Sequence, residues 1–124
     1  MQFSKETPVA NSISQYDAHS VTIRGVNHRG SLAVADQTLL ADWHCEHVDA
    51  LRESHLHALL SMKPEVIVLA TGSAPVFPDG ALMRQVMHAG VGIEIMNDGA
   101  AVRTFNVLIS EARRAVLALI RPTA

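Results

Sequence analysis

The chain has 124 residues, 48% hydrophobic and 18% charged, a balance typical of one folded globular domain rather than a disordered segment. Ten lysines and arginines against twelve acids give a formal net charge of -2 without a block of either sign, which argues against a nucleic-acid-binding surface. The single cysteine excludes an intramolecular disulfide, and no apolar run approaches the roughly 20 residues that span a bilayer. We therefore expect a cytoplasmic protein with no nucleic-acid partner and no membrane insertion.

The first 19 residues are polar, with one proline and isolated apolar positions, and they lack the apolar segment of a secretory signal. Such a segment buries too little apolar surface to be held firmly. The sequence predicts a flexible N-terminal arm over residues 1–19 and a single α/β domain over residues 20–124.

Two alternating segments begin the predicted domain. "SVTIRGV" places Val21 and Ile23 on one face, "NHRG" supplies turn residues, and "SLAVAD" alternates again through Leu32 and Val34. This pattern predicts an N-terminal β-hairpin. Residues 43–47 could form a short extended edge.

A helix is predicted over residues 48–62, because the apolar side chains fall within one arc at about 100° per residue. "EVIVLATG" then reads as a strand covered on both faces. Asp79 is a plausible N-cap for a helix over "GALMRQVMHA", with Gly90 as its stop, and "VGIEIM" follows as a strand. Strand, helix and strand in this order predict a parallel βαβ unit.

The C-terminal segment "GAAVRTFNVLISEARRAVLALIRP" has helical composition. Ala101, Phe105 and Leu108 keep helical spacing, whereas "AVLALI" suits a central strand equally well. The residues alone leave helix and strand open there.

A resemblance to a known family is carried by "PEVIVLATG", a proline-containing loop, "AGVGIEIMNDGAAVRTFNVLISEARR" and the closing apolar run. Its most specific positions are Gly99, Ala100, Ala101, Arg103, Thr104, Asn106, Val107, Leu108, Glu111 and Arg113. Over roughly residues 20–122 the sequence resembles the small Mth938-like family of domains of unknown function, which includes a mitochondrial complex I assembly factor.

The resemblance implies a single three-layer α/β domain with a mixed β-sheet, whose last strand, residues 114–120, runs antiparallel to its neighbours. It also implies a non-catalytic, assembly-factor-like role, with this chain as a prokaryotic relative.

The segment "WHCEHVDALRESHLH" holds four of the seven histidines and the cysteine, which are the ligand types of zinc and copper sites. On the predicted helix His55 and His57 point about 160° apart, and an extended edge would put His44 and Glu46 on one face with Cys45 on the other. Because zinc needs three or four convergent ligands, we expect no metal site.

No catalytic or cofactor motif is found. Cys45 has no predicted helix N-terminus beside it, no serine lies in a Gly-x-Ser-x-Gly turn, and the loop of Thr71, Gly72 and Ser73 lacks the glycines and lysine of a phosphate-binding loop. We therefore expect no cofactor, and favour a non-enzymatic binding or assembly module over an enzyme.

Topology gives the best ligand-site hypothesis, because the loops after the two parallel strands must emerge at one edge of the sheet. The candidate residues are Thr71, Gly72, Ser73, Arg103, Thr104 and Asn106. In one interpretation Arg103 anchors a small anion or metabolite near the helix N-terminus. In the other, which we favour, Arg103 and Asn106 tie the loops together through backbone carbonyls. A protein partner is accordingly preferred to a small molecule, and the arm or hairpin could support a homodimer.

Overall fold

The structure, a computed structural model, describes residues 10–123 and contains two sheets, with strand orders β1-β2-β3 and β5-β4-β8-β6-β7. The strands are β1 (Ile13–Tyr16), β2 (Ser20–Ile23), β3 (Val26–Arg29), β4 (Leu32–Ala35), β5 (Leu39–Leu40), β6 (Val66–Ala70), β7 (Gly92–Met96) and β8 (Ala115–Leu119). The helices are the short 3-10 helix η1 (Val48–Ala50), α1 (Glu53–Leu60), α2 (Gly80–His88) and α3 (Asp98–Ser110).

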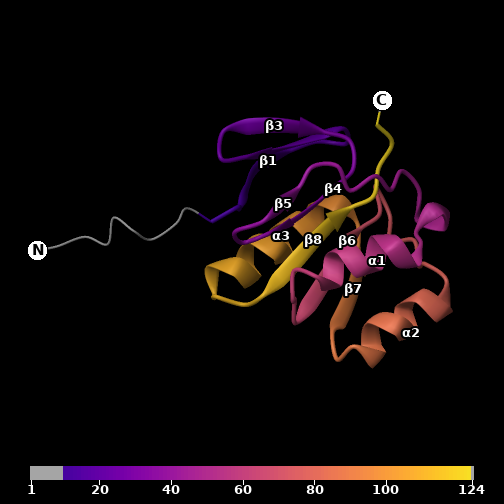
Figure 1. Ribbon diagram of the computed structural model, residues 1–124. Helices are drawn as coiled ribbons and strands as arrows, with labels where there is room; N and C mark the ends of the chain where they lie inside the picture. The colour runs from indigo at the N-terminus through magenta and orange to yellow at the C-terminus, as the bar shows by residue number, and fades with distance from the viewer. Residues whose placement is uncertain (1–9, 124) are drawn as a thin grey trace, which may run out of the picture.

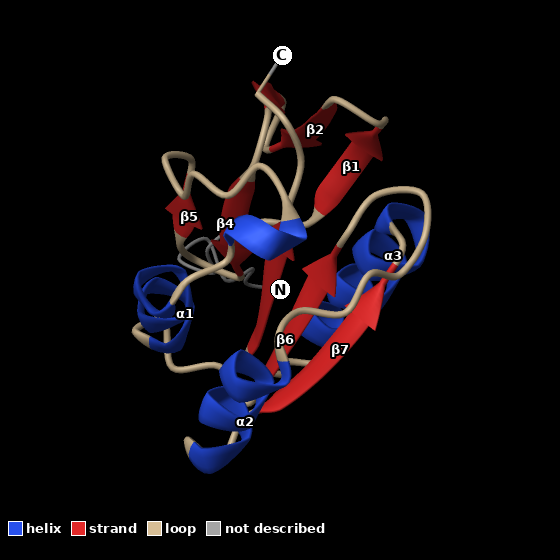
Figure 2. Cartoon of the chain, turned by 90° about the vertical axis from the view of Figure 1, so that its right-hand side faces the viewer, coloured by secondary structure: helices blue, strands red, loops and turns tan. Residues whose placement is uncertain are grey.

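The five-stranded sheet is the middle layer of the molecule. Figures 1 and 2 show α1 and α2 on one face of this sheet, with α3 and the three-stranded sheet on the other. In β8, Val116 and Ala118 pack toward α1 and α2, whereas Leu117 and Leu119 pack toward α3. Both faces of β8 are therefore covered, which explains its continuous apolar sequence. This confirms the expected three-layer α/β domain.

Strands β6, β7 and β8 run parallel, and β8 pairs with β4 in the antiparallel sense. The sheet is thus mixed, and the closing apolar run is a strand as the resemblance implies. The expectation that β8 runs antiparallel to its neighbours holds against β4 and is wrong against β6. Because three strands are parallel, their carboxyl ends and the loops after them meet at one edge of the sheet.

The N-terminal hairpin is present, but its second strand differs from the prediction. The turn lies at Arg24 and Gly25, whose φ angles of 51° and 78° match the two-residue turns that join twisted antiparallel strands. "NHRG", predicted as a turn, mostly forms β3, which pairs with β2, while β4 belongs to the other sheet. The asparagine and glycine that suggested a turn are therefore misleading there.

The expected arm lies partly outside the described residues, since residues 1–9 are not described. The described part of the predicted arm, residues 10–19, is not a loose segment, because β1 pairs with β2 and Ile13 is only 6% exposed. The buried Ile13 side chain anchors this segment. The Asn106 side chain of α3 adds hydrogen bonds to both the amide and the carbonyl of Ile13.

The helix predicted over residues 48–62 is broken. Val48–Ala50 forms η1, and the backbone of Leu51 and Arg52 is extended before α1 begins at Glu53. This break buries Leu51 and lets the Arg52 amide donate to the His55 ring. Residues 43–47, expected as a possible edge, form no strand; the edge strands of the five-stranded sheet are β5 and β7.

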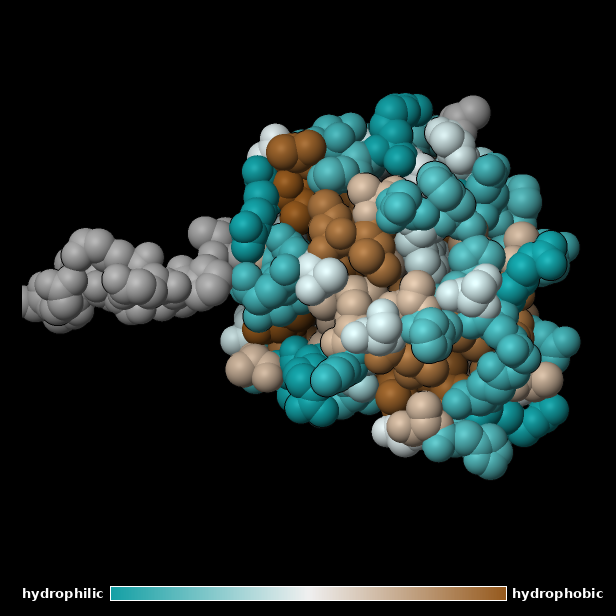
Figure 3. All heavy atoms as spheres, viewed as in Figure 1, coloured by the Kyte–Doolittle hydropathy of each residue, from teal (hydrophilic) through white to brown (hydrophobic). Residues whose placement is uncertain are grey.

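The parallel βαβ unit is confirmed. The Asp79 carboxylate accepts a hydrogen bond from the Ala81 amide at the start of α2, as an N-cap does, and Gly90 follows the helix with a φ of 78°. Within residues 10–123 no helix is long and apolar enough to cross a membrane; the longest, α3, has 13 residues. Figure 3 shows many polar side chains on one face, with apolar side chains gathered over the N-terminal strands and again in the lower part of the view. Val26 of β3 is 54% exposed.

Candidate functional site

The loop after β6 is fixed by Thr71. Its hydroxyl donates to the Ala74 carbonyl at 2.8 Å and accepts from the Val76 amide at 2.9 Å. The Thr71 amide donates to the Met96 carbonyl at the end of β7. The loop is therefore folded onto the edge of the sheet by its own first residue.

Asp98, the first residue of α3, joins the loops that follow the three parallel strands. Its Oδ1 accepts from the Gly72 amide at 2.9 Å, and its own amide donates to the Gly72 carbonyl at 2.8 Å. Its Oδ2 accepts from Nη2 of Arg121 at 3.0 Å. Because Gly72 follows β6, Asp98 follows β7 and Arg121 follows β8, this carboxylate links all three chain segments.

Arg121 is the unusual group at this edge. Its side chain is 3% exposed, and Asp98 is its ion-pair partner. Its Nε and Nη1 atoms are buried and have no hydrogen-bond partner among residues 10–123. A buried charged donor without a partner carries a large desolvation cost, so native proteins usually satisfy such donors.

A cavity of about 1190 Å³ opens at this edge of the sheet, with walls from several elements. Its apolar side chains include Leu51, Val76, Phe77, Leu82 and Ile120. Its carboxylates are those of Asp17, Glu46, Asp49, Asp79 and Asp98. Arg103, Arg121 and His47 also line the cavity. The volume is larger than most small-molecule sites require.

Four of the six predicted site residues line this cavity: Thr71, Gly72, Ser73 and Arg103. Thr104 and Asn106 do not line it. Asn106 points instead toward β1, where its Oδ1 accepts from the Ile13 amide at 2.8 Å and its Nδ2 donates to the Ile13 carbonyl at 2.9 Å. The polar stripe along α3 is therefore divided between two neighbours.

The favoured interpretation of Arg103 as a clamp differs from the structure. Arg103 is exposed, and within residues 10–123 it has no hydrogen bond or ion pair. The loops are held together by Asp98 instead. Arg103 is therefore a cation at the cavity wall whose donors are accessible.

Sequence reasoning missed Arg121, Asp98 and Phe77. Arg121 carried a usable signal, since it is the first charged residue after the apolar run of β8 and must reach the same edge as the other loops once β8 is parallel to β6. Asp98 follows β7 in the same way. Phe77 carried none, because its exposure depends on how the loop folds.

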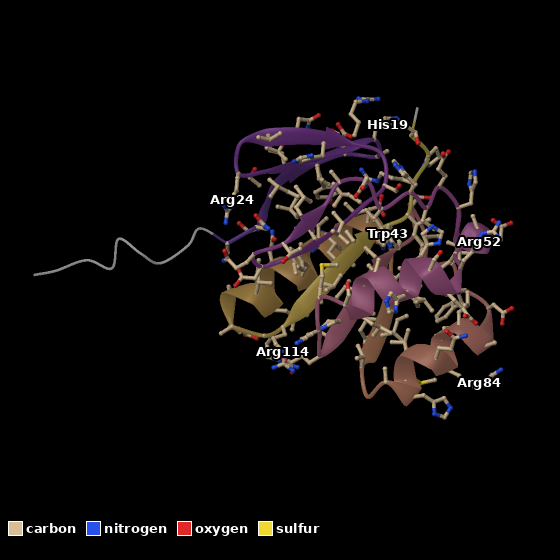
Figure 4. The ribbon with its side chains drawn as sticks, in the orientation of Figure 1. His19, Arg24, Trp43, Arg52, Arg84 and Arg114 are labelled. Carbon is tan, nitrogen blue, oxygen red and sulfur yellow. The ribbon has the colours of Figure 1, made fainter. Side chains whose placement is uncertain are left out.

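In the histidine-rich segment, His55 and Trp43 make hydrogen bonds that stabilise the fold. In His55, Nδ1 accepts from the Arg52 amide at 3.0 Å, so Nε2 carries the proton and donates to the His44 carbonyl at 2.6 Å. Trp43, beside α1 in Figure 4, donates from Nε1 to the His55 carbonyl at 3.1 Å. In the part of the chain that the structure describes, no three histidine, cysteine or acidic side chains are arranged to hold a metal ion.

Cys45 is buried, with its side chain 1% exposed. Burial raises the pKa of the Cys45 thiol to about 11. The thiol donates a hydrogen bond to the His47 carbonyl. A nucleophilic cysteine needs the opposite shift. The thiol is therefore protonated near neutral pH and poorly suited to attack a substrate.

Comparison with known proteins shows the family of this chain. Residues 13–120 match the family described as "Protein of unknown function (DUF498/DUF598)". The chain belongs to this family. It is 33% identical over 122 residues to NADH dehydrogenase (ubiquinone) 1 alpha subcomplex assembly factor 3 of Danio rerio, with 97% of this chain and 70% of the relative aligned. The resemblance seen in the sequence is confirmed.

A second relative is named differently. The "13 kDa major membrane protein" of Francisella tularensis is 29% identical over 68 residues, which are 55% of this chain and 55% of the relative. The assembly factor 3 of Rattus norvegicus is aligned over 64% of its own length. The chain thus spans little more than half to about two thirds of these curated relatives.

Solved structures show the same architecture. A Xanthomonas campestris protein has a TM-score of 0.80 at 31% identity, with 88% of this chain and 83% of that chain covered. A Bordetella pertussis protein titled as a Mth938-like domain has a TM-score of 0.81 at 23% identity, covering 99% and 95%. The second likeness supports the fold alone.

Proposed function

We propose that the protein is a non-catalytic binding module that holds a partner protein at the edge where β6, β7 and β8 end. The observation that carries this proposal is the exposure of two apolar side chains beside the cavity. Phe77 is 68% exposed and Val76 is 48% exposed, both on the loop between β6 and α2. Aromatic side chains at the surface of this kind are typical anchors of protein interfaces.

The loop that carries Phe77 is held in place before any partner arrives. Thr71 fixes its start through two side-chain hydrogen bonds, and Pro78 is buried at its end. A loop that is already ordered loses little conformational freedom on binding. This supports a recognition role for the loop.

The charges around the cavity favour a particular kind of partner. Asp17, Glu46, Asp49 and Asp79 line it and are exposed. A partner segment with an apolar side chain flanked by lysine or arginine would complement Phe77 and these carboxylates. We propose that chemistry for the docked segment.

Relatives named as assembly factors support a protein partner, and their named role is to assist NADH dehydrogenase assembly. The buried, protonated Cys45 and the engaged His55 support a role without catalysis. A cytoplasmic location remains our proposal, made on the single cysteine, although one relative is named as a membrane protein.

Photo-crosslinking in cells of the source organism tests the docking surface. A photoreactive phenylalanine analogue is placed at position 77 and, as the matched control, at Met87, which is 54% exposed on α2 and does not line the cavity. We expect one dominant protein crosslinked from position 77, through an apolar segment rich in lysine or arginine. The same proteins captured equally from both positions, or none from position 77, would reject the proposal.

A further inference from the structure

We propose that the cavity also binds a small organic anion, whose single carboxylate or phosphate group lies at the α3 end against Arg103, Arg121 and the Gly99 amide. Its apolar body would lie against the apolar wall. This site goes beyond the proposed docking of a partner protein and does not depend on it. The observations that carry it are a buried arginine with free donors, an accessible arginine and an unpaired amide at one helix end.

The first turn of α3 leaves one donor for a ligand. The Asp98 amide bonds the Gly72 carbonyl, the Ala100 amide bonds the Asn97 side chain, and the Ala101 amide bonds the Asn97 carbonyl. The Gly99 amide has no hydrogen-bond partner in the described part of the chain. An amide in the first turn of a helix lies at the positive end of the helix dipole, where anions are stabilised.

Because Gly99 has no side chain, two other side chains lie close to the start of α3. A Cβ at position 99 would lie 2.7 Å from the Tyr16 hydroxyl and 3.3 Å from Nη1 of Arg103. The absence of a side chain therefore lets both groups approach the backbone. An oxyanion beside Gly99 would have the Arg103 guanidinium within reach.

Arg121 supplies the second, independent indication of an anion. It lines the cavity, yet its Nε and Nη1 atoms are buried and without a partner within residues 10–123. Of the three guanidinium nitrogen atoms of Arg121, only Nη2 donates to Asp98. An oxyanion can approach the free pair only as cavity-wall side chains move aside, so Arg103 would make the first contact and Arg121 would complete the site. Arginine is suited to this task because its fork of donors matches carboxylate and phosphate oxygens.

The remaining walls select the ligand class. Leu51, Val76, Phe77 and Leu82 offer apolar contact on the side of α1 and α2, so the ligand needs an apolar body. The cavity also has the exposed carboxylates of Asp17, Glu46, Asp49 and Asp79, which would repel a ligand with several negative charges. The geometry therefore favours a molecule with one oxyanion group over nucleoside triphosphates or other polyanions.

The test uses purified full-length protein and four probes: hexanoate, hexyl phosphate, hexanol and ATP. Dissociation constants come from amide chemical shifts in nuclear magnetic resonance titrations. We expect hexanoate or hexyl phosphate to bind with saturable shifts at Gly99, and hexanol and ATP to bind at least tenfold more weakly. Hexanol binding as tightly as both anions would overturn the charge argument, and ATP binding as tightly would overturn the ligand class.

Variants separate the site from general charge effects. Arg103→Gln should weaken binding of the better anion by about tenfold or more, since a charge-assisted contact is lost. Arg114→Gln is the matched control, because Arg114 is exposed and does not line the cavity. In Figure 4, Arg114 lies at the far end of the molecule from His19, which follows the cavity residue Ala18. Equal weakening by both variants, or no weakening by Arg103→Gln, would reject the site.

Arg121 needs a paired variant, because Arg121→Gln alone strands the Asp98 carboxylate and risks unfolding. The double variant Arg121→Gln with Asp98→Asn replaces the ion pair by two neutral amides. We expect it to lose anion binding by tenfold or more. Asp98→Asn alone, which leaves Arg121 charged, should bind the anion at least as tightly as wild type. Unchanged binding by the folded double variant would remove Arg121 from the site. If the double variant does not fold, Arg121→Lys decides, because lysine keeps a charge beside Asp98 but lacks the free Nε and Nη1 donors. Binding by Arg121→Lys as tight as that of wild type contradicts the role of Arg121.

Discussion

Two arginines at one edge of the sheet differ in what surrounds them. Arg121 is buried against Asp98, whereas Arg103 is exposed on α3 and contacts no acid. Removing one partner of a buried ion pair leaves an uncompensated charge, but removing an exposed arginine that makes no hydrogen bond or ion pair has little effect on stability. The structural role assigned to Arg103 from the sequence therefore belongs to the Asp98–Arg121 pair.

The first prediction compares two neighbouring positions on α3. Arg103→Ala should change the free energy of unfolding by less than about 0.5 kcal/mol, because the side chain is exposed and has no hydrogen bond or ion pair within residues 10–123. Asn106→Ala should lower it by about 1 to 3 kcal/mol, since the Ile13 amide and carbonyl both lose their partner. Urea denaturation of the two variants and wild type measures both values. A loss of 1 kcal/mol or more in Arg103→Ala would restore the clamp interpretation.

At the scale of elements, local signals predicted the parts that depend on local sequence. The unit β6-α2-β7 was predicted because its strands are apolar runs and Asp79 and Gly90 mark the helix ends. The break before α1 was not predicted, because it depends on the burial of Leu51 and on a hydrogen bond from the Arg52 amide to the His55 ring. Tertiary contacts override a helical pattern in such a segment.

The candidate site shows the same division. The loops after β6 and β7 were predicted together because parallel strands bring their carboxyl ends to one edge. Arg121 was missed because the residues left "AVLALI" open between helix and strand, and the resemblance implied a strand antiparallel to β6. Its position at the site follows only from the parallel pairing of β8 with β6.

The second prediction concerns the first strand. Ile13 is buried in the core beside α3, so Ile13→Ala should lower the free energy of unfolding by about 2 to 4 kcal/mol. Gln15→Ala is the control, because Gln15 is exposed on the same strand and should tolerate the change. Thermal and urea denaturation provide the measurement. An Ile13→Ala variant as stable as the control would mean that β1 contributes little to the fold.

For the whole molecule, stability must depend on pH at both ends of the range. Backbone amides of His19 and Ser20 hold the pKa of Asp17 below its ordinary value of 3.8. A hydrogen bond from the Arg113 guanidinium, and then the Arg114 amide, hold the pKa of Glu65 below 4.5. Asp17 is exposed and the Glu65 side chain is 33% exposed, so solvent screening keeps each effect small.

The third prediction follows from the sign of these shifts. A carboxylate whose pKa is lowered by folding stabilises the protein at pH values above its ordinary pKa. This stabilisation is lost as the pH falls through the pKa of the folded state, so stability should decline below about pH 4.5. Cys45 acts in the opposite direction, because the unfolded chain gives up the thiol proton at lower pH than the folded chain does. Its contribution is complete below pH 9.0 and is lost as the pH rises to about 11. Urea denaturation across this range, for wild type, Glu65→Gln and Cys45→Ala, tests both arms. Glu65→Gln should flatten the acid decline, and Cys45→Ala should flatten the decline between pH 9 and 11. An alkaline decline equally steep in Cys45→Ala and wild type would show that other groups cause it.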